Sequence, residues 1–446
     1  MSKDPDNLTA RLLEAARSAG ADQADAMAVD GTSLSIDVRG GALEQAERSE
    51  GIELGLRVMV GQRQACVSAS DSRDATLVQM AERAVAMARE APEDPHIGLA
   101  DPAALAREIP DLDLADPAPE PEAAALEALA RRVEAAAAAV DGISQVDSST
   151  AAYGRHRIHL AASNGFSGGY ARSQTALGGV AITGAGLEME RDHAFELRSH
   201  AADLPTAEDI GAKAAERALD RRNPRKPETG SFPVVFDERI AASLIGHLAL
   251  AINGGAIARG SSWARDLLGK QVLPAGIDLV EQPHRPRIGG SRPFDAEGLA
   301  TSDRKLVDDG ILQGWVLDLA TGRQLGLDST ANASRSPAAP PSPSLTNLSL
   351  TPGATDRAGL CAMAGTGLLV TSFIGATVNP TTGDWSRGAA GLWIENGEPA
   401  YAVNECTIAG NLIAMLARIV PANDARDHAS RRVPSILIDG LTLAGS

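Results

Sequence analysis

The segment Phe373–Gly397, FIGATVNPTTGDWSRGAAGLWIENG, combines short apolar runs with many turn-forming residues. Glycine, asparagine and proline favour tight turns, so one interpretation is ordinary turn and hairpin structure within a sheet. The other is a peptide-binding surface, because glycine lets a second backbone approach closely. In that case Asn379 and Arg387 could bond main-chain groups of an extended peptide. Asp384 also lies close enough in sequence to pair with Arg387 across the turn.

The residues around this segment, from 231 to 446, read mainly as strands separated by Gly and Pro. A helix is expected over residues 237–250, where Asp237 is suited to the N-cap and apolar residues recur every four positions. The proline-rich segment 334–343, SRSPAAPPSP, predicts a long loop, suited equally to a functional role and to a surface excursion. The four tryptophans are expected in the core or in an interface. They are Trp263, Trp315, Trp385 and Trp393.

Before this region the chain reads as two units that each combine helices with antiparallel strands. Apolar spacing predicts helices over residues 7–19, 77–88 and 122–140. Alternating polarity and turn residues predict strands over 33–39, 51–60, 64–70 and within 144–199. Turns are expected at Gly61-Gln62, at Ser163-Asn164-Gly165 and at Ser167-Gly168-Gly169. Thr206 with Asp209 predicts a capped helix start.

Two segments rich in Pro and charge divide the chain, 111–122 (DLDLADPAPEPE) and 221–230 (RRNPRKPETG). Few core contacts are expected from the first of them, which reads as a linker. The predicted parts are an N-terminal α+β domain at 1–110, the linker 111–122, a middle α+β domain at 123–222 and a C-terminal β-rich domain at 223–446. The expected fold class is α+β, with α/β-sandwich-like N-terminal and middle parts followed by the β-rich part.

The composition narrows the class of protein. The chain has 446 residues and a net charge of −17, and so acidic a surface repels a phosphate backbone, which argues against direct nucleic-acid binding. Cys66, Cys361 and Cys406 are scattered and form no CxxC, which favours a reducing compartment. The first residues lack an apolar core of signal-peptide length, and no apolar run reaches the ~20 residues that cross a bilayer. A cytoplasmic protein with no membrane partner is expected.

Widespread catalytic motifs are missing from the sequence. It contains no G-x-x-x-x-G-K-[ST] phosphate loop, no G-x-S-x-G elbow and no H-E-x-x-H zinc helix. His156 and His159 are the closest pair of histidines, but in an alternating strand they face opposite sides and make poor co-ligands. His247, within the helix expected over 237–250, is the one lone histidine to weigh. By default we interpret His247 as a side chain that takes part in the packing of this helix.

Several segments together resemble the TldD/PmbA metallopeptidase family, and specifically its PmbA (TldE) branch. They run in order along nearly the whole chain. The segments are 47–58 (ERSEGIELGLRV), 317–333 (LDLATGRQLGLDSTANA), 373–397, 407–412 (TIAGNL) and 434–440 (PSILIDG). The resemblance implies a three-part chain and a hollow two-subunit assembly that takes in unfolded peptides.

For the TldD branch the resemblance implies a zinc ion held by an H-E-x-x-x-H helix and by a cysteine near the C-terminus. If His247 matches the second histidine, Ala242 stands at the first and Ser243 at the glutamate. A methyl group cannot ligate zinc, and a serine hydroxyl is a poor general base at neutral pH. Residues 424–433 hold no cysteine. This departure implies no metal, no cofactor and no catalytic residue in this chain, with zinc expected in a TldD-type partner.

The resemblance therefore implies a non-catalytic, substrate-holding subunit of a two-component metallopeptidase that degrades or trims unfolded peptides. Its expected partners are a TldD-type subunit and the peptide, with a homodimer as an option when the partner is absent. One alternative is a self-sufficient peptidase that uses Cys406 or Cys361 as nucleophile, which requires a histidine in hydrogen-bond reach. Another is a regulatory binding protein of a DNA gyrase-related pathway, acting indirectly through proteolysis of a peptide or a toxin.

Overall fold

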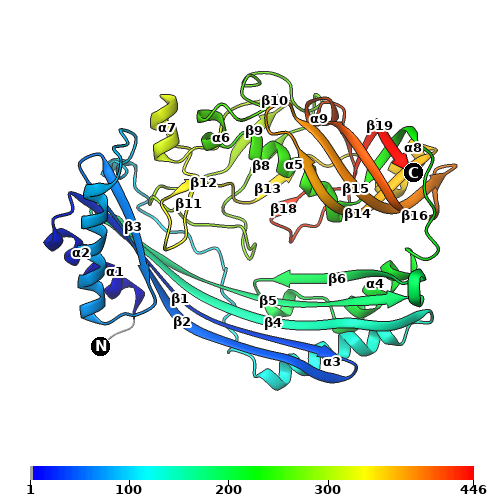
Figure 1. The fold of residues 1–446 in the computed structure, drawn as a ribbon, viewed down its shortest axis with the longest axis horizontal. Helices are drawn as coiled ribbons and strands as arrows, with labels where there is room; N and C mark the ends of the chain where they lie inside the picture. The colour runs from blue at the N-terminus through cyan, green and yellow to red at the C-terminus, as the bar shows by residue number, and fades with distance from the viewer. Residues whose placement is uncertain (1–3, 446) are drawn as a thin grey trace.

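The structure, a computed structural model, describes residues 4–445, apart from the side chain of Ala376. Residues 1–3 and 446, at the outer ends of the first and last predicted parts, lie outside the described residues. The fold is α+β, as expected. A long curved sheet built from the first half of the chain lies opposite a β-rich C-terminal part (Figure 1).

A six-stranded antiparallel sheet runs through the first half of the chain in the order β3-β2-β1-β4-β5-β6. Its strands are β1 (Gln23–Arg39), β2 (Ala42–Val60), β3 (Arg63–Ala69), β4 (Ile143–Ala162), β5 (Ser167–Thr183) and β6 (Glu190–Arg198). β1 pairs with β4 from Asp25 opposite Ala162 to Val38 opposite Ser149. The N-terminal and middle parts, which the sequence presents as separate units, therefore share one continuous sheet.

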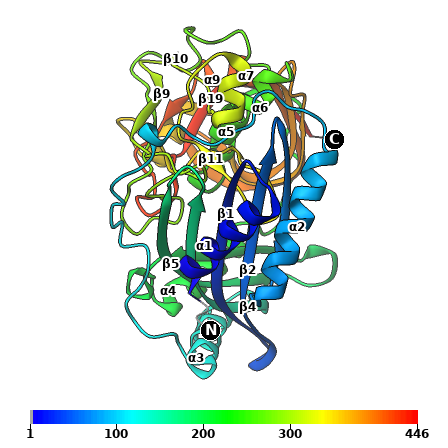
Figure 2. The same cartoon turned by 90° about the vertical axis from the view of Figure 1, so that its left-hand side faces the viewer.

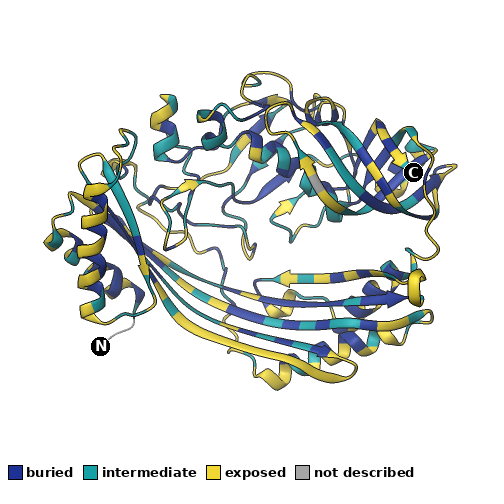
Figure 3. Cartoon of the chain, in the orientation of Figure 1, coloured by how far each residue is buried: buried dark blue, intermediate teal, exposed yellow. Residues whose placement is uncertain are grey.

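Four helices cover one face of this sheet: α1 (Pro5–Ala19), α2 (Asp74–Glu90), α3 (Ala123–Ala138) and α4 (Ala207–Leu219). The even-numbered side chains of β1 face them. Ala26 packs with α1 and α2, and Ile36 packs with α3 and α4. Because side chains alternate along a strand, the odd-numbered positions face the C-terminal part. Figure 2 views α1 and α2 from their end of the molecule, and Figure 3 shows the alternation of buried and exposed residues along the strands.

Local signals in this half are mostly confirmed. Gly20 ends α1 with a φ of 95°, and the Thr206 side chain accepts a hydrogen bond from the Asp209 amide at the start of α4. The turn predicted at Ser167-Gly168-Gly169 is wrong, because these residues begin β5 and pair with β4. A Cβ at Gly168 would press on Phe166, so this glycine serves close packing rather than a turn.

The predicted linker 111–122 makes more core contacts than expected. It forms no helix or strand, yet Leu112 and Leu114 are buried. The Leu114 carbonyl accepts from the Ser173 amide at 2.9 Å, and the Leu112 carbonyl accepts from the Arg287 amide at 3.0 Å. The expectation of few core contacts was wrong because two leucines among the prolines and acids suffice to fix this segment between β5 and the C-terminal part.

The C-terminal part is built on a small barrel. Its strands each pair with the next around the barrel, and the pairing of β16 with β19 closes it. They are β7 (Gly230–Phe236), β14 (Gly367–Val378), β15 (Asp384–Glu395), β16 (Glu398–Asn411) and β19 (Ile436–Gly445). β17 (Val420–Pro421) pairs with β19 in antiparallel orientation. A smaller sheet contains β8 (Leu279–Glu281), β9 (Arg304–Asp308), β10 (Ile311–Leu312), β13 (Leu348–Leu350) and β18 (Arg431–Arg432). The β-rich prediction for this part is confirmed.

Helix α5 (Glu238–Ala251) follows β7 directly and confirms the helix expected over 237–250. Asp237 caps it by accepting from the Arg239 amide at 3.1 Å. Leu244 and Leu248 are fully buried in the same core cluster as the four tryptophans, which confirms the buried position expected of those side chains. Four short helices were not expected from the sequence: α6 (Gly254–Ala258), α7 (Leu319–Leu325), α8 (Arg357–Ala364) and α9 (Leu412–Leu416). No helix between residues 4 and 445 is both long and apolar enough to cross a bilayer.

The proline-rich segment docks the C-terminal part onto the sheet. We call residues 335–341, between β11 (Ala333–Ser334) and β12 (Ser342–Pro343), the docking loop. The Arg335 side chain is fully buried and forms an ion pair with Asp25 of β1. The backbone of Pro337 lies so close to Gly55 of β2 that a Cβ there would collide with it. Of the two roles open to this segment, a surface excursion is therefore wrong.

Buried charges surround the docking loop. Arg57 pairs with Asp25 at 2.6 Å and also lies near the buried Glu297, whose carboxylate accepts from the Leu319 amide at 2.9 Å. Burial and the neighbouring charge of Asp295 raise the pKa of Glu297 to about 8. Burial likewise raises the pKa of Asp295 to about 6. The native state thus favours a protonated carboxyl group at this junction.

Replacing Gly55 with leucine should undock the loop. The new side chain must displace the Pro337 backbone, and overpacking of this kind costs about 1–3 kcal/mol. We expect a lower melting temperature and faster hydrogen exchange in residues 335–341. Gly51→Leu is the matched control, because it lies on the same strand and its Cβ would meet no atom within 4 Å. Equal behaviour of the two variants would contradict the docking role.

Replacing Glu297 with glutamine should change how stability depends on pH. The folded pKa of about 8 lies above the ordinary value near 4.3, so the contribution of Glu297 to stability is present at low pH and is lost as pH rises to about 8. Glutamine does not ionise. We therefore expect the melting temperature of Glu297→Gln, minus that of the wild type, to increase between pH 5 and pH 8. The same difference for the exposed Glu82→Gln should stay constant, and a constant difference for both would refute the assignment.

Candidate functional site

The helix–hairpin site consists of His247 on α5 together with Phe373, Trp385 and Arg387 on the β14–β15 hairpin. His247 is half-buried, and its Nε2 accepts a hydrogen bond from Trp385 Nε1 at 3.2 Å. Because an indole N–H can only donate, this nitrogen of His247 carries no proton. Burial and, to a smaller extent, the charge of Arg387 lower the pKa of His247. The imidazole is therefore neutral, with one lone pair already engaged.

Arg387 is the cation of this site. Its guanidinium lies over the Phe373 ring, 4.9 Å from the centroid, and that ring packs edge-on against Trp385 at 5.8 Å. Its Nε is buried and has no hydrogen-bond partner, and no described carboxylate forms an ion pair with it. Burial lowers the pKa of Arg387. Such a guanidinium is suited to bind an oxygen ligand, a peptide carbonyl or a carboxylate.

The predicted pairing of Asp384 with Arg387 is wrong. Residues three apart on a strand face opposite sides, so the two side chains diverge. The Asp384 carboxylate instead accepts from Asn411 Nδ2 at 3.0 Å and from Thr382 Oγ1 at 2.7 Å. These two hydrogen bonds lower the pKa of Asp384. The acid thus stabilises the turn and leaves Arg387 without a counter-charge.

Asn379 lies in the turn between the two strands. Its Oδ1 accepts from the amides of Thr381 at 2.9 Å and Thr382 at 3.2 Å, and Gly383 follows with a φ of 80°. This is the turn chemistry that the first interpretation describes. Asn379 Nδ2 makes no hydrogen bond within residues 4–445, the Ala376 side chain excepted. This nitrogen is therefore the part of the Asn379 side chain that is left to bind a peptide.

Ala242 and Ser243 lie on α5 one turn or more before His247. Ala242 is half-buried and packs against the main core, and Ser243 Oγ donates to the Ile240 carbonyl at 2.7 Å. Across the described residues, no three histidine, cysteine or acidic side chains come together so as to hold a metal ion. The donors near His247 are thus a hydroxyl, an indole N–H and a guanidinium.

The remaining sequence candidates lie apart from this site. His159 faces α1, with a ring nitrogen 2.8 Å from Thr9 Oγ1, whereas His156 faces the other side of the sheet next to Gly31. Cys406 donates to the Ala389 carbonyl at 3.2 Å, and burial raises its pKa to about 11. Burial also raises the pKa of Cys361. No hydrogen bond joins either sulfur to a histidine among the residues that the structure describes.

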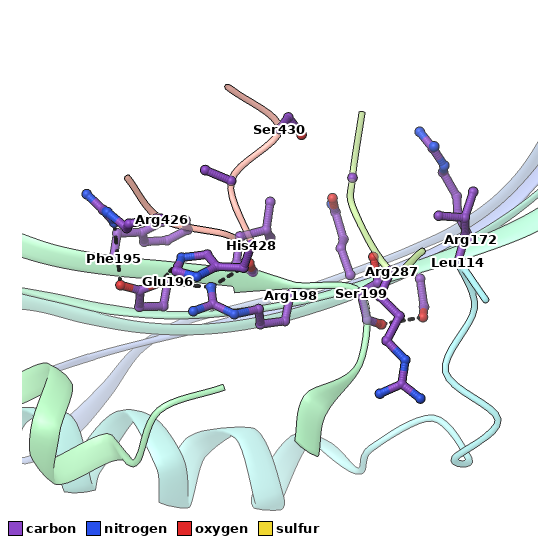
Figure 4. A pocket seen from close by; sticks show the side chains of 15 residues that line it. Leu114, Arg172, Phe195, Glu196, Arg198, Ser199, Arg287, Arg426, His428 and Ser430 are labelled. Atoms are coloured by element: carbon purple, nitrogen blue, oxygen red, sulfur yellow. Dashed lines mark hydrogen bonds and ion pairs between the residues drawn. The ribbon is translucent and has the colours of Figure 1, made fainter. Parts of the chain in front are cut away.

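Sequence reasoning did not identify an arginine-lined cavity. It has a volume of about 250 Å³ and opens between β5, β6 and two loops of the C-terminal part (Figure 4). Its arginines are Arg172, Arg198, Arg287 and Arg426. They come from four distant segments, so no local motif marks them.

Family models match all three parts of the chain. The PmbA/TldA metallopeptidase domain 1 matches residues 24–88, the central domain matches 116–222 and the C-terminal domain matches 229–445. Metalloprotease PmbA of Escherichia coli O157:H7 is 36% identical over 98% of this chain and 95% of its own length. The metalloprotease PmbA homolog of Haemophilus influenzae is 35% identical over 97% of this chain and 94% of its own length.

Solved structures share the whole fold. A protein from Bacteroides thetaiotaomicron, named as a candidate modulator of DNA gyrase, superposes with a TM-score of 0.91 at 26% identity, covering 99% of this chain and 98% of its own. TldE from Thermococcus kodakarensis has a TM-score of 0.86 at 18% identity, covering 98% of this chain and 100% of its own. With three family models matched in order and two curated relatives above 30% identity over nearly full length, the chain belongs to the PmbA/TldD metallopeptidase family, in its PmbA branch.

Proposed function

We propose that this chain is the zinc-free, peptide-holding subunit of a two-component metallopeptidase, acting in the cytoplasm beside a TldD-type subunit that carries the zinc. The proposal rests on the donor set around His247 in α5. Membership of a metallopeptidase family makes peptides the substrate class. Three free thiols fit a reducing compartment.

The residues present do not fit a zinc ion. Zinc in proteins takes four donors in a tetrahedron, drawn from neutral imidazoles, thiolates and carboxylates. Here His247 is the single imidazole, and Trp385 Nε1–H engages its Nε2 lone pair. Ala242 offers a methyl group, and Ser243 donates its hydroxyl hydrogen to the helix backbone. Arg387 adds a positive charge close enough to lower the pKa of His247, which opposes a second cation.

The site instead offers hydrogen-bond donors to peptide oxygens. Arg387 stacks on Phe373 and has no described carboxylate as partner. A stacked guanidinium keeps its donors in a fixed plane, which favours a main-chain carbonyl over a mobile water. Gly375 of the hairpin, where an added Cβ would meet no atom within 4 Å, leaves room for an approaching backbone. Peptide holding therefore centres on Arg387, with the Asn379 amide as a secondary donor.

The alternative of a self-sufficient cysteine peptidase has little support. A nucleophilic cysteine needs a lowered pKa and a base in reach. Burial moves the pKa of both Cys406 and Cys361 in the opposite direction. A role in a DNA gyrase-related pathway is suggested only by the names of structural neighbours, such as the B. thetaiotaomicron protein, and no residue that the structure describes adds to it.

Mixing this chain with a TldD-type subunit should create peptidase activity that the chain alone lacks. The isolated chain is expected to contain far less than one zinc per molecule and to leave an unstructured peptide intact. Adding a TldD-type subunit should start hydrolysis, and a chelator should stop it. Zinc content by atomic absorption and cleavage by mass spectrometry measure both. Stoichiometric zinc, or chelator-sensitive cleavage by the chain alone, would refute the proposal.

Replacing Arg387 with glutamine should weaken peptide holding in the mixed enzyme. A lost charge-assisted hydrogen bond is worth about 1.5–3 kcal/mol, so we expect KM to rise roughly tenfold or more. The same change removes a charge that lowers the pKa of His247, so that pKa should rise in an NMR titration. Arg83→Gln, on the exposed surface of α2, is the control. A raised His247 pKa with unchanged KM would exclude Arg387 from peptide holding.

A further inference from the structure

The outer edge of the six-stranded sheet is free along most of β2. β3 pairs with β2 only between Leu54 and Val60. Residues 42–53 pair with β1 on one side, and on their other side no strand within the described residues 4–445 lies against them. All of them except Ile52 are exposed, and Figure 3 shows this part of β2 in the exposed colour. We call residues 42–53 the β2 edge.

The β2 edge carries backbone groups without partners. In an antiparallel ladder every second residue of an edge strand directs its N–H and C=O away from the neighbouring strand. Apart from the ladder with β1, no backbone hydrogen bond joins residues 42–53 to any other part of the chain that the structure describes. An extended chain can pair with such a row of donors and acceptors as an added strand. At about 3.3 Å per residue, the edge is ~40 Å long.

The side chains of the β2 edge are mainly acidic. Its sequence, ALEQAERSEGIE, contains four glutamates and one arginine. The arginine, Arg48, is engaged in ion pairs with Glu50 and Glu120. Glu47 and Glu53 form no ion pair with any residue that the structure describes. Because side chains alternate along a strand, both glutamates lie on the same face, ~20 Å apart.

This charge selects among possible occupants. A second copy would place the same excess of negative charge on both sides of the junction, and like charges across paired strands are destabilising. A basic chain supplies the opposite charge. An unfolded peptide, moreover, has its backbone groups free for pairing, whereas a folded protein must present a free edge of its own. The edge is therefore best suited to an extended basic peptide.

We propose that the β2 edge binds a basic segment of an unfolded peptide as an added strand, with basic side chains opposite Glu47 and Glu53. The choice of a peptide rests on the proposed function, but the edge is distinct from the helix–hairpin site. Backbone pairing accepts many sequences, and the two glutamates favour those with basic residues six positions apart. The edge gives the two-component enzyme a second point of attachment for long peptides.

The test uses the full chain and twelve-residue peptides of threonine and glutamine, labelled with fluorescein at the N-terminus. One peptide has lysine at its positions 3 and 9, and a second has glutamate there. Two further lysine peptides carry backbone N-methyl groups, either at positions 5 and 7 or at positions 6 and 8. Fluorescence anisotropy measures the dissociation constants. We expect lysine to bind roughly fivefold more tightly than glutamate, because two exposed ion pairs are gained. One methylated peptide should bind roughly tenfold more weakly and the other as tightly as the unmethylated peptide, because only one of the two sets of N–H groups faces β2.

Variants place the binding on the β2 edge. The double variant Glu47→Lys, Glu53→Lys should reverse the preference, so that the glutamate peptide binds more tightly. Glu82→Lys with Glu90→Lys, at exposed positions of α2, changes the net charge equally and should keep the wild-type preference. Bound peptide should slow hydrogen exchange in residues 42–53 and leave β3 unchanged. Melting temperatures check folding, and the comparison of the methylated peptides stays valid without any variant.

Several results would overturn the inference. These are equal binding of the two methylated peptides, no binding of the lysine peptide, or a preference for lysine retained after Glu47 and Glu53 are replaced. Exchange in residues 42–53 that slows with protein concentration and without peptide would assign the edge to a second copy. Slowing by a TldD-type subunit that displaces the peptide would assign it to that subunit. Peptidase activity on mixing, without these preferences, would leave the proposed function standing and remove this site alone.

Discussion

The contact of the docking loop with the sheet fixes the arrangement of the whole molecule. Arg335 is fully buried with Asp25 as its ionic partner, and the Pro337 backbone lies against a glycine. A buried charge is costly unless it is paired, so the loop has one favourable position on β1 and β2. Because Asp25 and Gly55 both face away from the helices, the C-terminal part must sit on that face of the sheet.

This placement divides the face into a covered end and an open end. Near the docking loop, Leu160 and Phe166 of the first half pack with Phe294 of the C-terminal part, in edge-on contact at 5.0 Å between the phenylalanine rings. Toward β6 the two halves meet through charged side chains instead, among them Glu196 and Arg426. Polar, imperfectly matched contacts leave a cavity where apolar packing would fill it. The arginine-lined cavity is thus a consequence of where the apolar contact ends.

Sequence reasoning succeeded where a signal is local and failed where it is not. The caps at Gly20, Thr206 and Asp237 could be read from neighbours a few positions away, whereas the comparison of positions 242, 243 and 247 with a zinc motif depended on the resemblance to a family. The pairing of Asp25 with Ala162 joins residues far apart in the chain, and strand pairing at that range leaves no local trace. The same limit hid the hydrogen bond between Trp385 and His247, and the cavity that four separate segments line. The capping box at Asp318 and Thr321 was a readable signal for α7 that was overlooked.

On the proposed function α5 binds no metal, so its surface is free for other contacts. An unprotonated imidazole nitrogen in a half-buried place requires a donor, and the Trp385 indole supplies one. The indole in turn packs against Phe373, on which the Arg387 guanidinium lies. His247 is thereby linked to Arg387 through two aromatic rings. On the proposed function, the chain retains the helix and hairpin of a peptidase because they orient a group that holds peptide oxygens, while hydrolysis takes place in the partner.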